Sequence, residues 1–384
     1  MSWLFIIFSI YLGLHLFIYL SIVYFFELSQ ESKLKLGLIL VFLLLSFIVS
    51  SILSRWNDFF LINYYYVFSS FWIGFAINLS LFLLGAWMLL GISKLFSTDI
   101  RTLLGVSAFL VALFYSFYGV WKARNPIVKE LEVEIKDLPR EWRGKKIVQI
   151  SDVHLGKIQG EKFADKIVEI VNGLNGEIIF ITGDLIDGMA VGVSDYAQII
   201  NQLKSKQGTY FVTGNHEIYL GKAKAIEALQ ETDIKLLENE AVQLNGLQII
   251  GLGFNNFGQV RKKGTLKQLN NFKKGRPSIL LYHTPVSIIE ENDDASFQHS
   301  SLYWFPKIDF SEAKNNGVRL QLSGHTHNGQ LFPFNFLTHF IYKGFDYGLH
   351  KDGDFSIYIT SGAGTWGPPM RTWGNSEIVL ITLK

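Results

Sequence analysis

The run Ile147-Val148-Gln149-Ile150-Ser151-Asp152-Val153-His154 decides the fold, because a short apolar segment ends in two side chains that can bind a metal. If the run stays extended through His154, Asp152 and His154 point the same way, since side chains at i and i+2 share one face of a strand. Both would then lie at the carboxyl end of a strand, where open α/β sheets bind ligands. An isolated Asp-x-His occurs often by chance, so the interpretation depends on the rest of the chain.

Four later segments repeat this arrangement of an apolar run followed by polar donors. They are 178–182 before Gly183-Asp184, 210–213 before Gly214-Asn215-His216-Glu217, 280–282 before His283, and 320–323 before Gly324-His325-Thr326-His327. Core packing does not explain polar donors that recur at the ends of successive strands. We therefore predict a metal site. Its predicted ligands are Asp152, His154, Asp184, Asn215, His283, His325 and His327.

The second half of the chain alternates strand-like and helix-like patterns. Runs rich in Ile, Val, Phe and Tyr predict strands at 146–151, 177–182, 209–213, 247–251, 278–282, 318–323, 355–360 and 377–383. Amphipathic spacing predicts helices at 161–172, 195–205 and 222–231. The β-α-β-α-β order at the start predicts a parallel sheet covered by helices, and hence an α/β fold.

The first part of the chain has a different composition. Residues 1–121 carry only nine Asp, Glu, Lys or Arg, while the remaining 263 residues carry 59, which places a boundary near Trp121. A membrane span needs about 20 apolar residues. We expect transmembrane helices near 3–26, 36–54, 69–93 and 102–121. Asn63-Tyr64-Tyr65-Tyr66, at the start of the third uncharged run, resembles an interfacial collar. The first segment resembles a retained helix more than a signal peptide.

The side of the membrane that carries the large domain stays open. An even number of spans places the N-terminus and this domain on the same side, and the flanking basic residues are balanced between the two sides. Within the spans only His15 and Asn78 are notably polar. They could mark a transport pathway, but a hydrogen bond to a neighbouring helix is the favoured interpretation, with the helices as an anchor.

Charge and cysteine content exclude other classes of function. The net charge of +2 is too small to indicate a nucleic-acid partner. The chain has no cysteine, which excludes disulfides, thiolate metal sites and a cysteine nucleophile.

The five motif blocks, in this order, resemble the calcineurin-like metallophosphoesterase superfamily over roughly residues 145–384. The segment 362–371 (Gly-Ala-Gly-Thr-Trp-Gly-Pro-Pro-Met-Arg) further resembles the bacterial membrane-associated branch, here with N-terminal transmembrane helices. The resemblance implies a sandwich of two β-sheets flanked by helices, preceded by a four-helix transmembrane region. The expected domains are the transmembrane region 1–121, a linker with the first strand at 122–144, and the metallophosphoesterase domain 145–384 with an aromatic insertion near 287–310.

The resemblance also divides the site residues. It implies that one metal is held by Asp152, His154, Asp184 and His327, and the second by Asp184, Asn215, His283 and His325. It places His216 as a catalytic residue that stabilises charge or protonates the leaving oxygen. Arg371 is a candidate clamp for a phosphate, although an ordinary surface arginine is an equal alternative. Glu217 is expected to support the ligands. The donors suit two divalent ions, Mn, Fe or Zn.

These observations predict an integral protein of the cell (inner) membrane. They also predict a dinuclear-metal phosphoesterase that hydrolyses a phosphate ester or pyrophosphate, in particular that of a lipid. The attacking group would be a hydroxide that bridges the metals. The segments 287–310 and 331–342, which are rich in apolar and aromatic residues, would then contact the bilayer, or else pack together as a small separate core. The expected partners are the lipid bilayer and a phosphorylated lipid or small phosphoester, without nucleic acid. The alternatives are a general phosphodiesterase or phosphomonoesterase on soluble esters, and a non-catalytic metal-binding scaffold.

Overall fold

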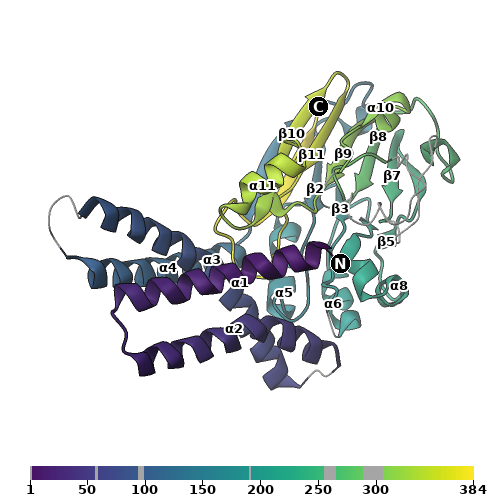
Figure 1. Cartoon of the computed structure of the whole chain (residues 1–384). Helices are drawn as coiled ribbons and strands as arrows, with labels where there is room; N and C mark the ends of the chain where they lie inside the picture. The colour runs from purple at the N-terminus through teal and green to yellow at the C-terminus, as the bar shows by residue number, and fades with distance from the viewer. Residues whose placement is uncertain (1, 57–58, 94–98, 190–191, 255–264, 289–305) are drawn as a thin grey trace. The chain divides into compact units, whose positions relative to one another are not determined.

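The computed structural model describes residues 2–56, 59–93, 99–189, 192–254, 265–288 and 306–384. The chain forms two compact units (Figure 1): the N-terminal helices together with Gly367–Thr372, and Ala123–Trp366 together with Trp373–Lys384. We call them the helical unit and, after the family that its motifs resemble, the phosphoesterase unit. Most of the predicted aromatic insertion, including Trp304 and Phe305, lies outside the described residues.

The helical unit contains four helices that are long and apolar enough to cross a membrane. They are α1 (Ser2–Phe25), α2 (Gln30–Trp56), α3 (Phe60–Ser93) and α4 (Arg101–Ala123). Helix α3 begins at Phe60, earlier than the expected start near residue 69, so the tyrosines at 64–66 are part of the helix, and their position at the interface stays a prediction. No glycine or proline interrupts the segment 60–69, and the helical hydrogen bonds that a bilayer demands therefore continue through it.

The two polar side chains inside the spans each bond to a neighbouring helix. The indole N–H of Trp72 on α3 donates to Nε2 of His15 on α1 at 3.0 Å. The side-chain amide of Asn78 on α3 donates to the hydroxyl of Ser116 on α4 at 2.9 Å. The predicted hydrogen bonding between helices is confirmed for both residues.

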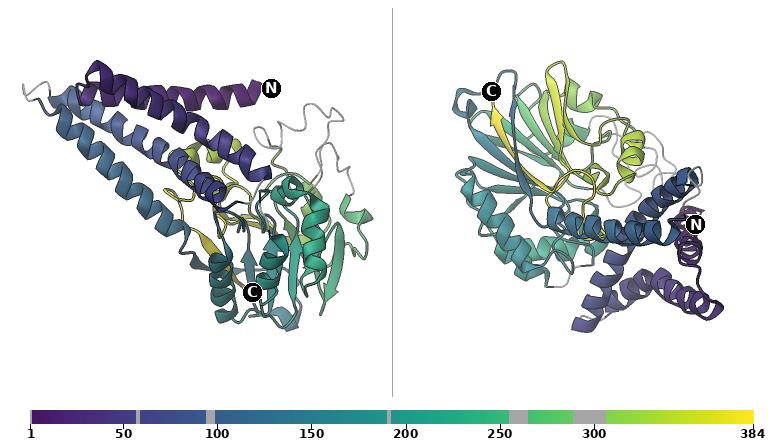
Figure 2. Two further views of the ribbon diagram at one scale, coloured as in Figure 1. Left: turned by 90° about the horizontal axis from the view of Figure 1, so that it is seen from below. Right: turned by 90° about the vertical axis from the view of Figure 1, so that its left-hand side faces the viewer.

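The phosphoesterase unit is built on two six-stranded mixed sheets, as expected (Figures 1 and 2). The first sheet has the order β1-β12-β2-β3-β4-β5 and the second β10-β11-β9-β8-β7-β6. The strands are β1 (Ile127–Val133), β2 (Lys146–Ile150), β3 (Ile178–Thr182), β4 (Thr209–Val212), β5 (Lys235–Leu236), β6 (Glu240–Leu244), β7 (Leu247–Leu252), β8 (Ser278–Tyr282), β9 (Val318–Ser323), β10 (Gly348–Asp352), β11 (Phe355–Ile359) and β12 (Glu377–Leu383). Parallel pairing of β2 with β3 and of β3 with β4 confirms the predicted β-α-β-α-β unit.

Helices and short turns connect these strands and cover the sheets. They are η2 (Arg140–Trp142), α5 (Glu161–Gly173), α6 (Val193–Ile200), α7 (Asn215–Leu220), α8 (Lys222–Gln230), η3 (Thr265–Gln268), α10 (Ser311–Asn315), η4 (His327–Gly329) and α11 (Phe334–Ile341). The predicted helices correspond to α5, α6 and α8, with α6 ending at Ile200, earlier than the expected 205.

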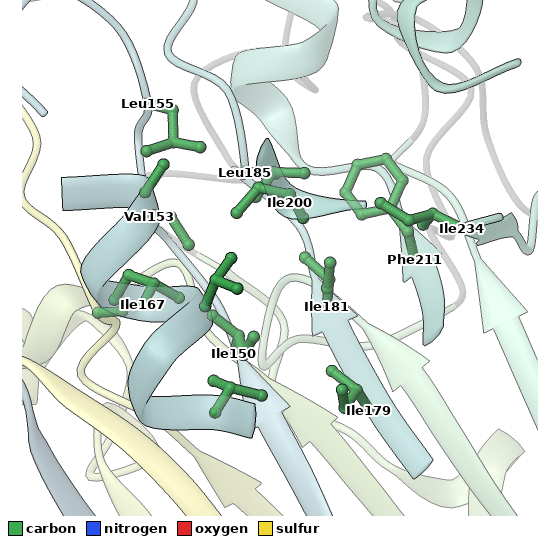
Figure 3. Close-up of a cluster of buried hydrophobic side chains, with 14 of the residues drawn as sticks. Ile150, Val153, Leu155, Ile167, Ile179, Ile181, Leu185, Ile200, Phe211 and Ile234 are labelled. Carbon is green, nitrogen blue, oxygen red and sulfur yellow. The ribbon is translucent and has the colours of Figure 1, made fainter. Parts of the chain in front are cut away.

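Strand β3 is apolar along nearly its whole length because both of its faces are buried. Along β3, Ile179 and Ile181 belong to the core beneath the helices, whereas Ile178 and Phe180 belong to the core between the two sheets. Figure 3 shows the first of these cores, with Ile167 of α5 and Ile200 of α6 gathered with Ile179, Ile181 and other strand residues. The two cores hold the strands rigidly, so the strand ends present their polar residues in a defined arrangement.

Candidate metal centre

Most of the predicted ligands occupy tight turns directly after the strands, while Asn215 begins helix α7. Strand β2 ends at Ile150, and both Asp152 and His154 have a φ of 52°. His325 and His327, after β9, have φ values of 75° and 51°. The expectation that the strand stays extended through His154 is therefore wrong. Asp152 and His154 nevertheless lie on the same side of the chain. Val153, between them, is buried in the core beneath the helices and so holds both ligands on the opposite side.

Glycine is required beside two of the ligands because their carboxylates approach the backbone closely. A Cβ atom on Gly324 would lie 2.1 Å from Oδ2 of Asp152, and one on Gly214 would lie 2.2 Å from Oδ1 of Asp184. Any side chain at these positions would displace the carboxylate.

The structure brings all seven predicted ligands together as a continuous chain of donor atoms. Nε2 of His327 lies 3.3 Å from Oδ1 of Asp152 and 3.0 Å from Nε2 of His154. Nε2 of His154 lies 3.8 Å from Oδ2 of Asp184.

The chain continues beyond Asp184 to the remaining ligands. Oδ2 of Asp184 lies 3.1 Å from Nε2 of His283. Oδ1 of Asn215 lies 3.1 Å from the same nitrogen and 2.9 Å from Nδ1 of His325. Asp184 therefore stands between two groups of donors, as a ligand shared by two cations would.

The orientation of His283 suits metal binding. Its Nδ1 donates to the carbonyl oxygen of Thr182 at 2.8 Å, so Nε2 is the ring nitrogen that faces Asp184 and Asn215 and would bind a cation in place of its proton. A backbone carbonyl that holds the other ring nitrogen is the usual partner of a metal-binding histidine. The two facing Nε2 atoms of His154 and His327 also fit a cation, because two lone pairs at 3.0 Å repel each other unless a proton or a cation lies near both.

Charge in the site favours cations. Four carboxyl groups are buried together there: Asp152, Asp184, Asp187 and Glu217. Burial raises the pKa of Asp152 to about 6, and burial together with the charge of Asp184 raises the pKa of Glu217 to about 7. Burial also lowers the pKa of His154 to about 3, and it is therefore neutral, the form that binds metals. Against the effect of burial, the carboxylates in turn raise the pKa of His283 to about 9 and also raise the pKa of His216, so protonated imidazoles balance part of the buried negative charge, and divalent cations would take over that role when they bind.

His216 lies beside the donors and is held by a carboxylate that sequence reasoning missed. Its Nδ1 lies 3.0 Å from Oδ1 of Asp187, and its ring is edge-on to that of His154 with centroids 4.4 Å apart. Although burial opposes it, the charge of Asp184 and the bond to Asp187 raise the pKa of His216. Because Asp187 holds Nδ1, Nε2 is the nitrogen left to face a substrate. The spacing Gly183-Asp184-x-x-Asp187 was the available signal for this residue.

Glu217 supports the ligand-bearing turns through its two carboxylate oxygens. Oε2 accepts from the backbone N–H of Asp184 at 3.0 Å and of Gly214 at 2.7 Å, and Oε1 accepts from the N–H of Ile186 at 3.0 Å. It thereby ties the turn that carries Asp184 to the turn before Asn215.

Arg371 is placed differently from the other predicted site residues. It belongs to the helical unit, where it is fully buried and its backbone N–H donates to the carbonyl oxygen of Gly119 at 2.9 Å. The alternative of an ordinary surface arginine is therefore wrong. A role in binding substrate stays a prediction.

Comparisons with known proteins show which family this chain is similar to. Residues 145–329 match the family described as calcineurin-like phosphoesterase. An uncharacterized metallophosphoesterase of Campylobacter jejuni is 33% identical over 76% of this chain and 72% of its own length. A transmembrane protein with metallophosphoesterase domain from Danio rerio is 32% identical over 73% of this chain and 62% of its own length. Among solved structures, TT1561 of Thermus thermophilus aligns over 57% of this chain and 91% of its own with 13% identity and a TM-score of 0.35.

The helices and these relatives together indicate a membrane protein. The identity to the Campylobacter jejuni relative, over most of both chains, establishes the family of the catalytic part. The chain belongs to the calcineurin-like phosphoesterase family and is a metal-dependent phosphoric ester hydrolase.

Proposed function

We propose that this membrane-anchored hydrolase uses two divalent cations to cleave a phosphate ester or pyrophosphate of a lipid. Asp152, His154, Asp184 and His327 would hold one cation, and Asp184, Asn215, His283 and His325 the other. The observation that carries the metal assignment is the unbroken series of donor atoms on both sides of Asp184.

The residues around the cations have separate tasks in this proposal. Two bound cations would neutralise the phosphoryl oxygens and lower the pKa of a water molecule. His216 would donate a hydrogen bond or a proton from Nε2 to the leaving oxygen, and Asp187 would keep the ring in the orientation and charge state that this requires. Glu217 would hold Asp184 in place through the backbone.

A group of exposed aromatic side chains next to the site supports a lipid substrate. Helix α11 packs on η4, the turn that begins with His327. Phe336 and Phe340 of this helix are 63% and 80% exposed, and Trp373 is 40% exposed. The rings of Phe332, Phe336 and Trp373 contact one another, with centroids 5.8 to 6.5 Å apart. We call Phe332, Phe336, Phe340 and Trp373 the aromatic face.

The bilayer is the natural partner of the aromatic face. Only residues 124–126 separate α4 from β1, so chain connectivity keeps the phosphoesterase unit near the end of a membrane helix. Aromatic residues favour the interface between lipid and water, where their rings leave water and their polar edges remain hydrated. A lipid phosphate would then meet the metals without leaving its membrane.

A comparison of lipid and soluble substrates tests the proposal. Purified full-length protein in lipid nanodiscs, supplied with Mn²⁺, is assayed on lipid phosphates and on soluble esters such as bis-p-nitrophenyl phosphate, with Asp184→Ala as the inactive control. The expected result is a higher kcat/KM for a lipid ester, abolished by Asp184→Ala. Hydrolysis of soluble esters alone would favour the general phosphoesterase, and no hydrolysis of any ester would favour a scaffold.

The double variant Phe336→Ser/Phe340→Ser tests the aromatic face. Burying a whole phenylalanine contributes about 2 kcal/mol, so the two exposed rings together contribute at most roughly 3 kcal/mol of transfer into lipid, or about 100-fold. We expect kcat/KM for the lipid ester to fall by up to that factor while soluble-ester hydrolysis is retained. Leu349→Ser, an exposed leucine on β10, is the matched control and should leave both unchanged. Equal losses on both esters would contradict the role of the aromatic face.

A further inference from the structure

The segment Gly367–Thr372 connects β11 to β12 along the chain, yet it packs with the helices. It forms one compact unit with the four long helices, whereas Trp366 and Trp373 on either side of it belong to the phosphoesterase unit. The chain therefore leaves the phosphoesterase unit for these six residues and returns to it.

Two glycines, one on α3 and one on α4, make room for this segment. A Cβ atom on Gly74 would lie 2.7 Å from Sδ of Met370 and 3.0 Å from Cβ of Pro368. A Cβ atom on Gly119 would lie 3.2 Å from Cβ of Met370 and 3.3 Å from the carbonyl oxygen of Arg371. All four separations are shorter than ordinary van der Waals contact, so a larger residue at either position would push Met370 out of place.

Polar contacts fix the backbone of the same segment. The N–H of Arg371 donates to the carbonyl oxygen of Gly119 at 2.9 Å, and the hydroxyl of Tyr115 on α4 donates to the carbonyl oxygen of Thr372 at 2.8 Å. Backbone groups among apolar helices require such partners, because leaving them unpaired there costs several kcal/mol. The segment is thus held by shape at Met370 and by hydrogen bonds at its end.

The two residues that flank the segment in the chain, Trp366 and Trp373, are both held by Gln330. The side chain of Gln330 accepts from the backbone N–H of Trp366 and donates to the backbone carbonyl oxygen of Trp366, both at 3.0 Å. The backbone carbonyl oxygen of Gln330 accepts from the N–H of Trp373 at 3.1 Å. Gln330 directly follows η4, which begins at His327. The ring of Trp366 lies 6.1 Å from that of His216, centroid to centroid.

We propose that Gly74, Gly119 and Met370 are positioning residues for hydrolysis of membrane-borne phosphoesters. Packing of Met370 against the two glycines holds the segment, and the ends of the segment hold the tryptophans that border His216 and the aromatic face. Loosening it would leave the metal ligands intact but would disturb the entry of a substrate that arrives from the membrane. This inference rests on the proposed lipid substrate.

A cross-link tests the packing itself, independently of activity. The chain has no cysteine, so Gly119→Cys/Met370→Cys introduces the only pair of thiols. The Cβ separation of 3.2 Å is close to the range of about 3.5–4.5 Å found in disulfides. Mild oxidation in nanodiscs should form the disulfide, detected by loss of free thiol in intact mass analysis. Gly85→Cys/Met370→Cys is the control and should stay reduced, because a Cβ atom on Gly85 has no neighbour within 4 Å. No cross-link in the first pair would overturn the inference.

Activity of size-swapped variants tests the positioning role. We expect Gly74→Leu and Gly119→Leu to lower the ratio of lipid to soluble-ester kcat/KM roughly tenfold or more, since small misplacements near a reacting group have such effects. Gly85→Leu on the same helix as Gly74 should leave the ratio unchanged. Gly74→Leu/Met370→Ala, which returns space to the site, should recover much of the loss.

The outcomes separate this inference from the proposed function. Wild-type protein that hydrolyses only soluble esters would refute the lipid function and this inference with it. Lipid hydrolysis whose ratio to soluble-ester hydrolysis is unaffected by Gly74→Leu and Gly119→Leu, or is not rescued by Met370→Ala, would refute this inference alone.

Discussion

Replacing Glu217 by glutamine tests how the metal centre is supported. Glu217 is fully buried, and its two oxygens accept three backbone N–H groups, those of Asp184, Ile186 and Gly214. Glutamine has one acceptor oxygen. If that oxygen keeps the bonds to Asp184 and Gly214, the amide nitrogen faces the N–H of Ile186, and at least one buried donor is left unpaired.

The cost follows from that count of donors. One buried, unpaired N–H costs about 1–3 kcal/mol. At roughly 2–4 °C per kcal/mol for a domain of this size, the melting temperature of metal-free protein should fall by about 6 °C. Because the turns that carry Asp184 and Asn215 share this carboxylate, we also expect Mn²⁺ to bind about 10- to 100-fold more weakly, as it does when the supports of other metal ligands are removed.

Calorimetry and Mn²⁺ titration of detergent-solubilised protein measure both effects. Glu169→Gln is the matched control, since Glu169 is exposed on α5 and its replacement should change stability by less than about 0.5 kcal/mol. A Glu217→Gln protein with wild-type melting temperature and wild-type Mn²⁺ affinity would refute the assignment of Glu217 as the tie between the two turns.

Three further predictions concern the proton donor, the core and the metals. Asp187→Asn should lower kcat about 100-fold on esters with poor leaving groups and far less on p-nitrophenyl esters, because it removes the carboxylate that orients His216; equal losses on both ester types would contradict this. Phe180→Ala, fully buried between the sheets, should cost about 3–5 kcal/mol in calorimetric unfolding, and a loss below about 1 kcal/mol would count against the packing described. Treatment with a chelator should abolish hydrolysis and lower the melting temperature, with recovery on adding Mn²⁺; activity that persists in chelator would exclude a metal-dependent mechanism.

Patterns that depend on neighbours along the chain were predicted well. The four long apolar segments and the strands before each metal-binding motif could be read from the sequence, because burial on both faces of a strand or inside a bilayer demands continuous apolar runs. The backbone at the ligands was not predicted. Asp152 and His154 adopt left-handed turns, and a period-two argument reaches the right side chains through the wrong conformation.

Partnerships between distant residues required the folded chain. The pairing of Asp187 with His216 and the three backbone bonds of Glu217 join segments that only the sheet brings together. The sequence of helix α11 indicates only an apolar run, and the structure was needed to show which of its aromatic side chains are exposed.

The sequence by itself determined the two-part organisation and the chemistry of the site, since donor type and apolar runs are properties of the residues and their order. Only the tertiary structure decided where Gly367–Thr372 lies, because packing against Gly74 and Gly119 depends on which surfaces have room for a backbone. Shape complementarity between segments about 250 to 300 residues apart leaves no local pattern in the chain, and it becomes apparent only when both surfaces are formed.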